Sequence, residues 1–126
     1  MKLKKEIKTL WINALRSGKY QQGIGALQDS KGQFCCLGVL CDLHMNHTDT
    51  KEEWERDHNG CFGNWTYLRN RSLCPGKVYD WAIDPSQASL GYMRIFYDNK
   101  FRGLDVLNDT YKLRFHNIAD LIEEQL

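Results

Sequence analysis

Five residues near the N-terminus have the side chains that often hold small ligands: Tyr20, Gln21, Gln22, Gly23 and Gly25. An aromatic ring can stack on a base or sugar, side-chain amides read hydrogen-bonding edges, and glycines let backbone N–H groups approach a phosphate. The residues do not form a dinucleotide-binding or P-loop motif, which needs a glycine-rich turn between a strand and a helix. A glycine-containing β-hairpin explains the same residues at least as well.

Asn108 and Asp109 form a second polar pair, placed where one short element ends and another begins. Such side chains commonly cap a turn by bonding to the neighbouring backbone. In a cleft, they could instead exchange hydrogen bonds with a ligand. We predict that ligand recognition, where it occurs, centres on residues 20–25 and this pair. The two can meet because the first and last helices each have one apolar face to bury against the other.

Two adjacent thiols, Cys35 and Cys36, lie where a short strand is expected to lead into a helix. A helix N-terminus stabilises a thiolate, which is how cysteine hydrolases activate their nucleophile, but such enzymes also need a histidine base. The chain has four histidines, His44, His47, His58 and His116. None stands in a context that marks it as the partner, and buried cysteine is a common core residue. We therefore assign no catalytic residue and keep a cysteine-dependent hydrolase as an alternative.

Metal binding by Cys41, His44 and His47 is a weaker hypothesis. These residues are spaced i, i+3, i+6, but zinc sites usually have closely paired ligands at both ends of the site. Cys41 is more simply a core residue, so we predict no metal and no cofactor.

The five cysteines cannot all pair within one chain: Cys35, Cys36, Cys41, Cys61 and Cys74. No secretory signal is recognisable at the N-terminus, because polar residues follow its basic start. We expect reduced, mostly buried thiols and a cytoplasmic location. The 17 basic and 16 acidic side chains leave a net charge of +1, which argues against non-specific binding to duplex nucleic acid. No apolar run approaches the roughly 18 residues of a membrane-spanning helix.

Hydrophobic periodicity predicts helices over residues 3–17, 36–44, 75–82 and 115–125, with a short helical turn over 104–107. Two short stretches, 25–28 and 33–35, flank a turn-forming loop and predict a β-hairpin. Further strands are expected over 65–68 and within 90–101, ahead of an Asp98-Asn99 turn. Residues 44–73 are irregular. We predict one α+β domain over 1–126, in which a small antiparallel sheet packs with three to four helices.

Three stretches resemble a family of small proteins encoded by tailed bacteriophages and prophages. Residues 11–27 read W-I-N-A-L-R-S-G-K-Y-Q-Q-G-I-G-A-L, and residues 34–43 read F-C-C-L-G-V-L-C-D-L. The third stretch is L-N-D at 107–109, followed by F-H-N-I-A-D-L-I-E at 115–123. The resemblance implies a phage accessory protein in the host bacterial cytoplasm and carries no catalytic assignment. Residues 44–73 and 86–101 lie outside it.

Three functions remain open at this level. The first is a non-enzymatic binder of a small nucleotide-like signal, acting against host defence, which predicts a deep polar pocket. The second is a protein-binding inhibitor of a host enzyme, which predicts an exposed aromatic patch within residues 50–100. The third is the cysteine-dependent hydrolase. The composition leaves a homo-oligomer open.

Overall fold

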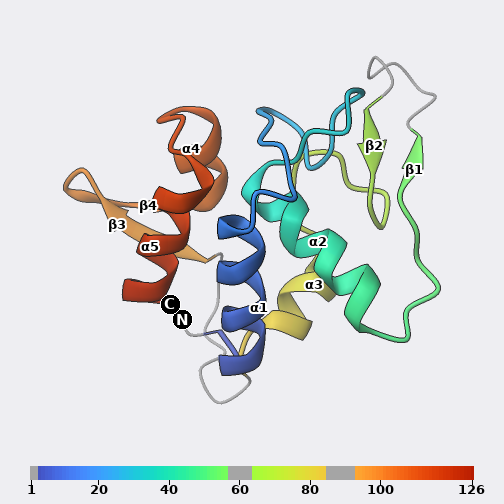
Figure 1. Ribbon diagram of the computed structural model, residues 1–126, viewed down its shortest axis with the longest axis horizontal. Coiled ribbons are helices and arrows are strands. Elements are labelled where there is room, and N and C mark those ends of the chain that lie inside the picture. The colour runs from blue at the N-terminus through green and yellow to red at the C-terminus, as the bar shows by residue number, and fades with distance from the viewer. Residues whose placement is uncertain (1–2, 57–63, 85–92) are drawn as a thin grey trace.

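The computed structural model describes residues 3–56, 64–84 and 93–126. The helices are α1 (Lys5–Arg16), α2 (Cys36–His47), α3 (Gly76–Ala82), α4 (Leu104–Asp109) and α5 (Phe115–Gln125). The strands are β1 (Glu55–Arg56), β2 (Trp65–Thr66), β3 (Arg94–Tyr97) and β4 (Lys100–Gly103). They form two separate antiparallel pairs, β1 with β2 and β3 with β4, so the α+β class is confirmed (Figure 1).

Helices α1 and α5 pack side by side and run in opposite directions, which brings the two ends of the chain together (Figure 1). The backbone N–H of Leu3 donates to the carbonyl of Leu126 at 3.4 Å. On the outer surface, Arg16 pairs with Asp120 at 2.7 Å and with Glu123 at 2.6 Å. The apolar periodicity of both helices therefore reflects one shared interface, as the sequence predicted.

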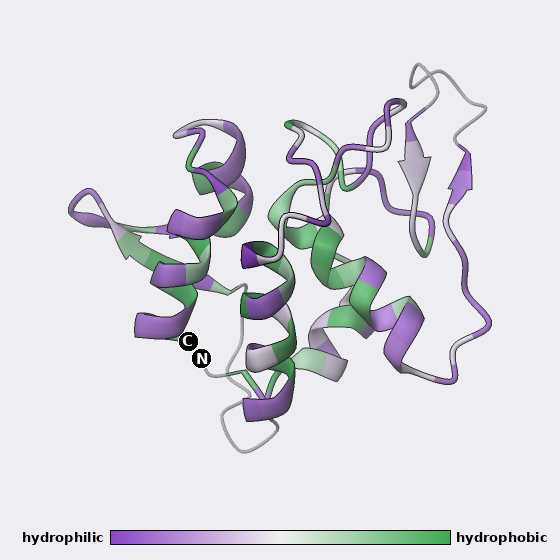
Figure 2. Cartoon of the chain, in the orientation of Figure 1, coloured by the Kyte–Doolittle hydropathy of each residue, from purple (hydrophilic) through white to green (hydrophobic). Residues whose placement is uncertain are grey.

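Helix α2 is buried on most of its sides and lies at the centre of the domain, where hydrophobic residues extend along much of its length (Figure 2). Trp11 of α1 is fully buried and donates its indole N–H to the carbonyl of Cys36 at 3.0 Å. The backbone of Leu27 crosses directly over Gly38 and leaves no room for a side chain at that position. Within the described part of the chain, no helix is long and apolar enough to cross a membrane.

The hairpin predicted from residues 25–28 and 33–35 forms only as one antiparallel bridge, between Gln28 and Phe34, and not as a pair of continuous strands. Phe34 forms isolated bridges with both Gln22 and Gln28, so no continuous ladder develops. The Asp29 carboxylate accepts hydrogen bonds from the backbone N–H groups of Lys31 and Gln33, both at 2.9 Å. This side-chain bonding stabilises a compact turn in place of two extended strands.

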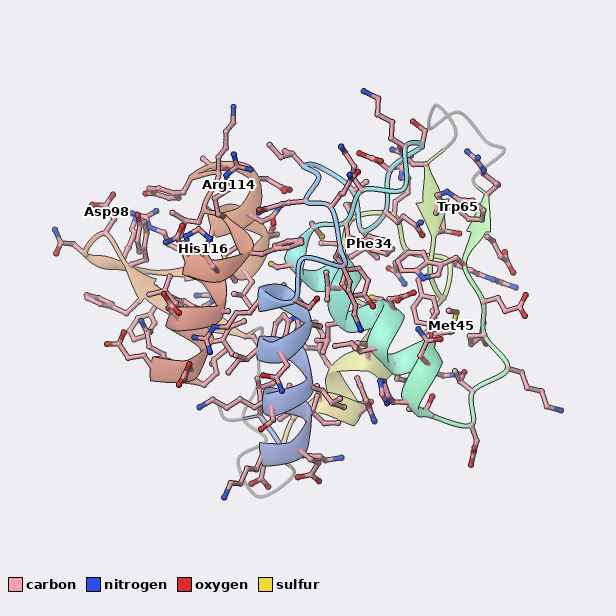
Figure 3. All side chains as sticks on the ribbon, in the orientation of Figure 1. Phe34, Met45, Trp65, Asp98, Arg114 and His116 are labelled. Carbon is pink, nitrogen blue, oxygen red and sulfur yellow. The ribbon has the colours of Figure 1, made fainter. Side chains whose placement is uncertain are left out.

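A regular hairpin forms over residues 94–103, where one strand was predicted within residues 90–101; residues 90–92 lie outside the described part. Asp98 and Asn99 have φ values of 52° and 63°, the left-handed conformation of a two-residue type I′ turn. They connect β3 to β4 at the outer end of the hairpin, where Figure 3 shows Asp98 away from the helices. The strand predicted over 65–68 is shorter than expected, since Leu68 begins a left-handed turn with φ of 50°.

We predict that Gly38→Ala lowers the free energy of unfolding by about 3 kcal/mol. The new Cβ would overlap the carbonyl oxygen of Leu27 and lie 2.6 Å from its carbonyl carbon. Gly76→Ala is the matched control, because a Cβ there meets no heavy atom within 4 Å and should change stability by about 1 kcal/mol or less. Urea denaturation of both variants is the measurement, and equal stability would contradict the close approach.

Candidate functional site

The two segments predicted to share a ligand site are in direct contact. Gln22 Nε2 donates to Asn108 Oδ1 at 2.9 Å, and Asn108 Nδ2 donates to the carbonyl of Gly23 at 2.9 Å. The packing of α5 against α1 brings them together, by the route that the apolar faces of the two helices predicted.

Their polar groups, however, bond to one another and to the backbone. Asn108 is fully buried; its Oδ1 also accepts from the N–H of Cys36 at 3.2 Å, and its Nδ2 also donates to Asp109 at 2.8 Å. Gln22 donates to the carbonyl of Leu113 at 2.7 Å and accepts from the N–H of Phe115 at 3.0 Å. These two amides form a polar cross-link between residues 22–23 and the adjoining ends of α2, α4 and α5.

Tyr20 also bonds within the protein. Its hydroxyl donates to Asp42 at 2.6 Å, and its ring meets the edge of the Phe34 ring with centroids 5.1 Å apart. Burial, together with the hydrogen bond to Asp42, raises the pKa of the Tyr20 hydroxyl. Gln21 and Gly25 are exposed, and Gly25 has a φ of +84° that favours glycine. A ligand-binding role for residues 20–25 and 108–109 stays a prediction, although most of the polar side chains already bond within the fold.

The adjacent thiols sit at the start of α2, as predicted, in surroundings that suppress the thiolate. The N–H of Gly38 donates to Cys35 Sγ at 3.4 Å, and Cys36 Sγ donates to the carbonyl of Leu104 at 3.6 Å. Burial raises the pKa of Cys35 to about 12 and raises that of Cys36 well above its usual value. A nucleophile needs the opposite shift. No histidine of the described chain bonds to either thiol, so the geometry does not favour the hydrolase alternative.

Two of the three other cysteines are also buried. Cys41 and Cys74 are buried free thiols, as are Cys35 and Cys36, while Cys61 lies outside the described residues. His44 is buried, its Nδ1 lies 2.8 Å from the Tyr67 hydroxyl, and burial lowers the pKa of its imidazole. Among the described residues, no group of three or more potential metal-ligating side chains comes together.

Sequence reasoning missed a concave site, a pocket of about 450 Å³ along β4. We call it the β4 pocket. Its apolar lining includes Leu37, Leu73, Tyr79, Met93, Phe101 and Leu104. Its charged lining consists of Arg94, Lys100, Arg102 and Asp105. The guanidinium of Arg102 bonds to the carbonyls of Tyr97 and Asp98 and forms an ion pair with the Asp98 carboxylate at 3.7 Å. Among the described residues, neither Arg94 nor Lys100 forms an ion pair.

Exposed apolar side chains adjoin this pocket. Phe96 is 50% exposed, and both Phe101 and Leu73 are 64% exposed. The two phenyl rings are cross-strand partners with centroids 5.2 Å apart. We call these three residues the hairpin patch. In the sequence, Phe96 and Phe101 flank the Asp98-Asn99 turn symmetrically, and this spacing is the signal that could have placed them on one face of a hairpin.

We predict that Asn108→Ala lowers the free energy of unfolding by about 3 kcal/mol, because it removes four hydrogen bonds and leaves the N–H of Cys36 and the carbonyl of Gly23 unsatisfied in the interior. Asp109→Ala is the control, since it removes one of these bonds from a half-buried site and should cost about 1 kcal/mol. Thermal or urea denaturation measures both. Equal stability of the two variants would show that the cross-link is not structural.

Comparison with curated proteins and with solved structures found no match. A family model, by contrast, matches residues 3–126, so it spans all the helices and strands described above. The match assigns no activity to any residue, and the function has to be argued from the geometry. The chain belongs to the family described as a domain of unknown function, DUF8296.

Proposed function

We propose that this protein works without catalysis, by binding another protein through the hairpin patch. The observation that supports this most is the pair of exposed phenyl rings on a two-stranded arm that extends from the helices (Figure 1). Adjacent exposed aromatic side chains are typical of interaction surfaces, where they become the buried centre of a contact. The protein-binding hypothesis expected an exposed aromatic patch within residues 50–100; Phe96 and Leu73 lie in that range, and Phe101 lies just outside it.

The surroundings of the patch support the same function. Arg94 and Lys100 lie beside Phe101 along the β4 pocket, so a polar, cationic rim adjoins an apolar centre. This arrangement is common in protein interfaces. The resemblance to tailed-phage proteins suggests which kind of partner is bound. We propose a host protein that is bound in the bacterial cytoplasm and is inhibited or redirected by the contact.

A small nucleotide-like ligand, such as a host defence signal, is the second candidate. The volume of the β4 pocket, about 450 Å³, falls in the range of roughly 300–1,000 Å³ typical of small-molecule sites. Its aromatic and cationic lining suits a ligand with a ring and an anionic group. We rank it second because the residues first expected to hold such a ligand bond largely to one another.

We predict that the double variant Phe96→Ser/Phe101→Ser loses a partner that the tagged wild-type protein retains from bacterial lysate. Both side chains are at least half exposed, so the folded state should lose little stability. Ile24→Ser is the matched control, because Ile24 is 52% exposed and lies outside the hairpin. Mass spectrometry identifies the retained proteins. Retention of the same proteins by the double variant, or no retention by the wild type, would contradict the proposal.

The second candidate makes a separate prediction for the native mass spectrum of protein purified from lysate. If the β4 pocket holds a small anion, the wild-type spectrum contains a small-molecule adduct that Arg94→Glu loses, because the substitution reverses a charge lining the pocket. Arg69→Glu, which makes the same charge change outside this pocket, should keep the adduct. An adduct unaffected by Arg94→Glu, or none at all, argues against a small ligand here.

A further inference from the structure

The hairpin has two outer edges, and the protein covers them unequally. At the β3 edge, the N–H of Phe96 donates to Gln125 Oε1 at 2.7 Å, and Gln125 Nε2 donates to the carbonyl of Phe96 at 3.0 Å. One side-chain amide at the end of α5 thus imitates the backbone of a neighbouring strand. It satisfies both polar groups that Phe96 directs away from β4.

The register of the β3–β4 pairing determines which backbone N–H and C=O groups of β4 point away from β3. In a two-residue hairpin, the residues next to the turn, here Tyr97 and Lys100, bond to each other, and bonded pairs alternate with non-bonded pairs along the ladder. Phe96 and Phe101 therefore form a non-bonded pair. The contacts of Phe96 with Gln125 agree with this, and the N–H and C=O of Phe101 must point away from β3.

Among the described residues, no side chain bonds to the outer edge of β4 as Gln125 bonds to the outer edge of β3. Neither the N–H nor the C=O of Phe101 has a hydrogen-bond partner there. An uncovered strand edge offers a donor and an acceptor at the spacing of an extended chain. Here the same strand also lines the β4 pocket and carries the more exposed of the two phenyl rings.

We propose that an extended, acidic segment of the partner protein adds to β4 as a third strand and places an apolar side chain in the β4 pocket. The inference rests on the proposed protein-binding function and specifies how the partner is held. Backbone hydrogen bonds to Phe101 supply affinity, and the pocket selects the side chain, because residues of an added strand alternate between its two faces.

Charge selects the partner. The residues that line the β4 pocket include Arg94 of β3 and Lys100 and Arg102 of β4, against the single carboxylate of Asp105. Arg102 is paired with Asp98, so the excess positive charge comes from Arg94 and Lys100. Acidic residues next to the apolar anchor would therefore be favoured. The same charges disfavour a second copy of this chain as the occupant: two antiparallel β4 strands centred on Phe101 would place Lys100 of each opposite Arg102 of the other, and like charges directly opposite are destabilising.

The test uses a displayed library of random peptides of about eight residues, long enough for one strand. Selection on the full-length wild-type protein should enrich peptides with an apolar residue flanked by Asp or Glu. In hydrogen exchange followed by NMR, the selected peptide should slow exchange of the Phe101 amide. The Phe96 amide, already bonded to Gln125, serves as the internal control and should change little.

Two substitutions at one position separate strand addition from simple apolar contact. Phe101→Ala removes the ring and keeps the N–H, whereas Phe101→Pro removes both, at an outward-facing position where an edge strand tolerates proline. Loss of one backbone hydrogen bond should make the proline variant bind the peptide about tenfold more weakly than the alanine variant. Equal affinity, with the Phe101 amide of the wild type unprotected, would overturn strand addition.

The outcomes separate this inference from the proposed function. A partner lost by the Phe96→Ser/Phe101→Ser variant, together with equal affinities of the proline and alanine variants, would keep protein binding and remove strand addition. Enrichment of basic or purely apolar peptides, or of none, would overturn the predicted partner chemistry. A concentration-dependent dimer in sedimentation analysis that Phe101→Pro abolishes would replace the partner segment with a second copy of the chain.

Discussion

The architecture depends on one fully buried amide. Apolar contacts among α1, α2 and α5 are non-directional and would tolerate several relative positions of the helices. The hydrogen bonds of Asn108 allow only one relative position, because a buried polar group left without a partner costs about 1–3 kcal/mol. Asn108 bonds to the backbone at Gly23 and Cys36 and to the side chain of Gln22. These bonds fix the end of α4 against the start of α2 and against the loop that precedes α2. Since β4 leads directly into α4, the same bonds set where the hairpin begins.

The sequence predicted the helices better than the strands. Helices α1 and α5 follow from apolar residues on one face, and α2 from an apolar run bounded by polar segments. The turn at residues 29–32 was predicted correctly, but the strands expected on either side of it were not, because turn chemistry looks the same whether it joins two strands or forms a carboxylate-capped loop. The contact between residues 20–25 and Asn108 was predictable from helix packing. The hydrogen-bond partners of the Gln22 and Asn108 amides could not be predicted, because the tertiary structure decides whether a buried amide faces a ligand or the backbone.

The β4 pocket could not be predicted from any one segment. Its lining includes Leu37 of α2, Leu73 of the loop before α3, Met93, Arg94 and residues 100–106, which only the tertiary structure brings together. The uncovered edge of β4 is harder still to predict. It can be recognised only once the hydrogen bonds that Gln125 makes to the β3 edge are known. Nothing near Gln125 in the sequence indicates that its amide binds Phe96. Once that bond is known, the alternation of hydrogen bonds along a hairpin identifies Phe101 as the uncovered position.

The hairpin is suited to accept a strand because it is held in place beforehand. Two strands of four residues are at best marginally stable alone, so other contacts must fix them. Gln125 holds one edge, and Tyr111 lies against the far side, where its ring meets Tyr97 at 5.2 Å and the Arg102 guanidinium at 4.8 Å. Binding then requires ordering mainly of the incoming segment, because β4 already has its extended conformation. Most of the conformational entropy lost on association would therefore come from the partner, and the affinity would depend on how readily that segment becomes extended.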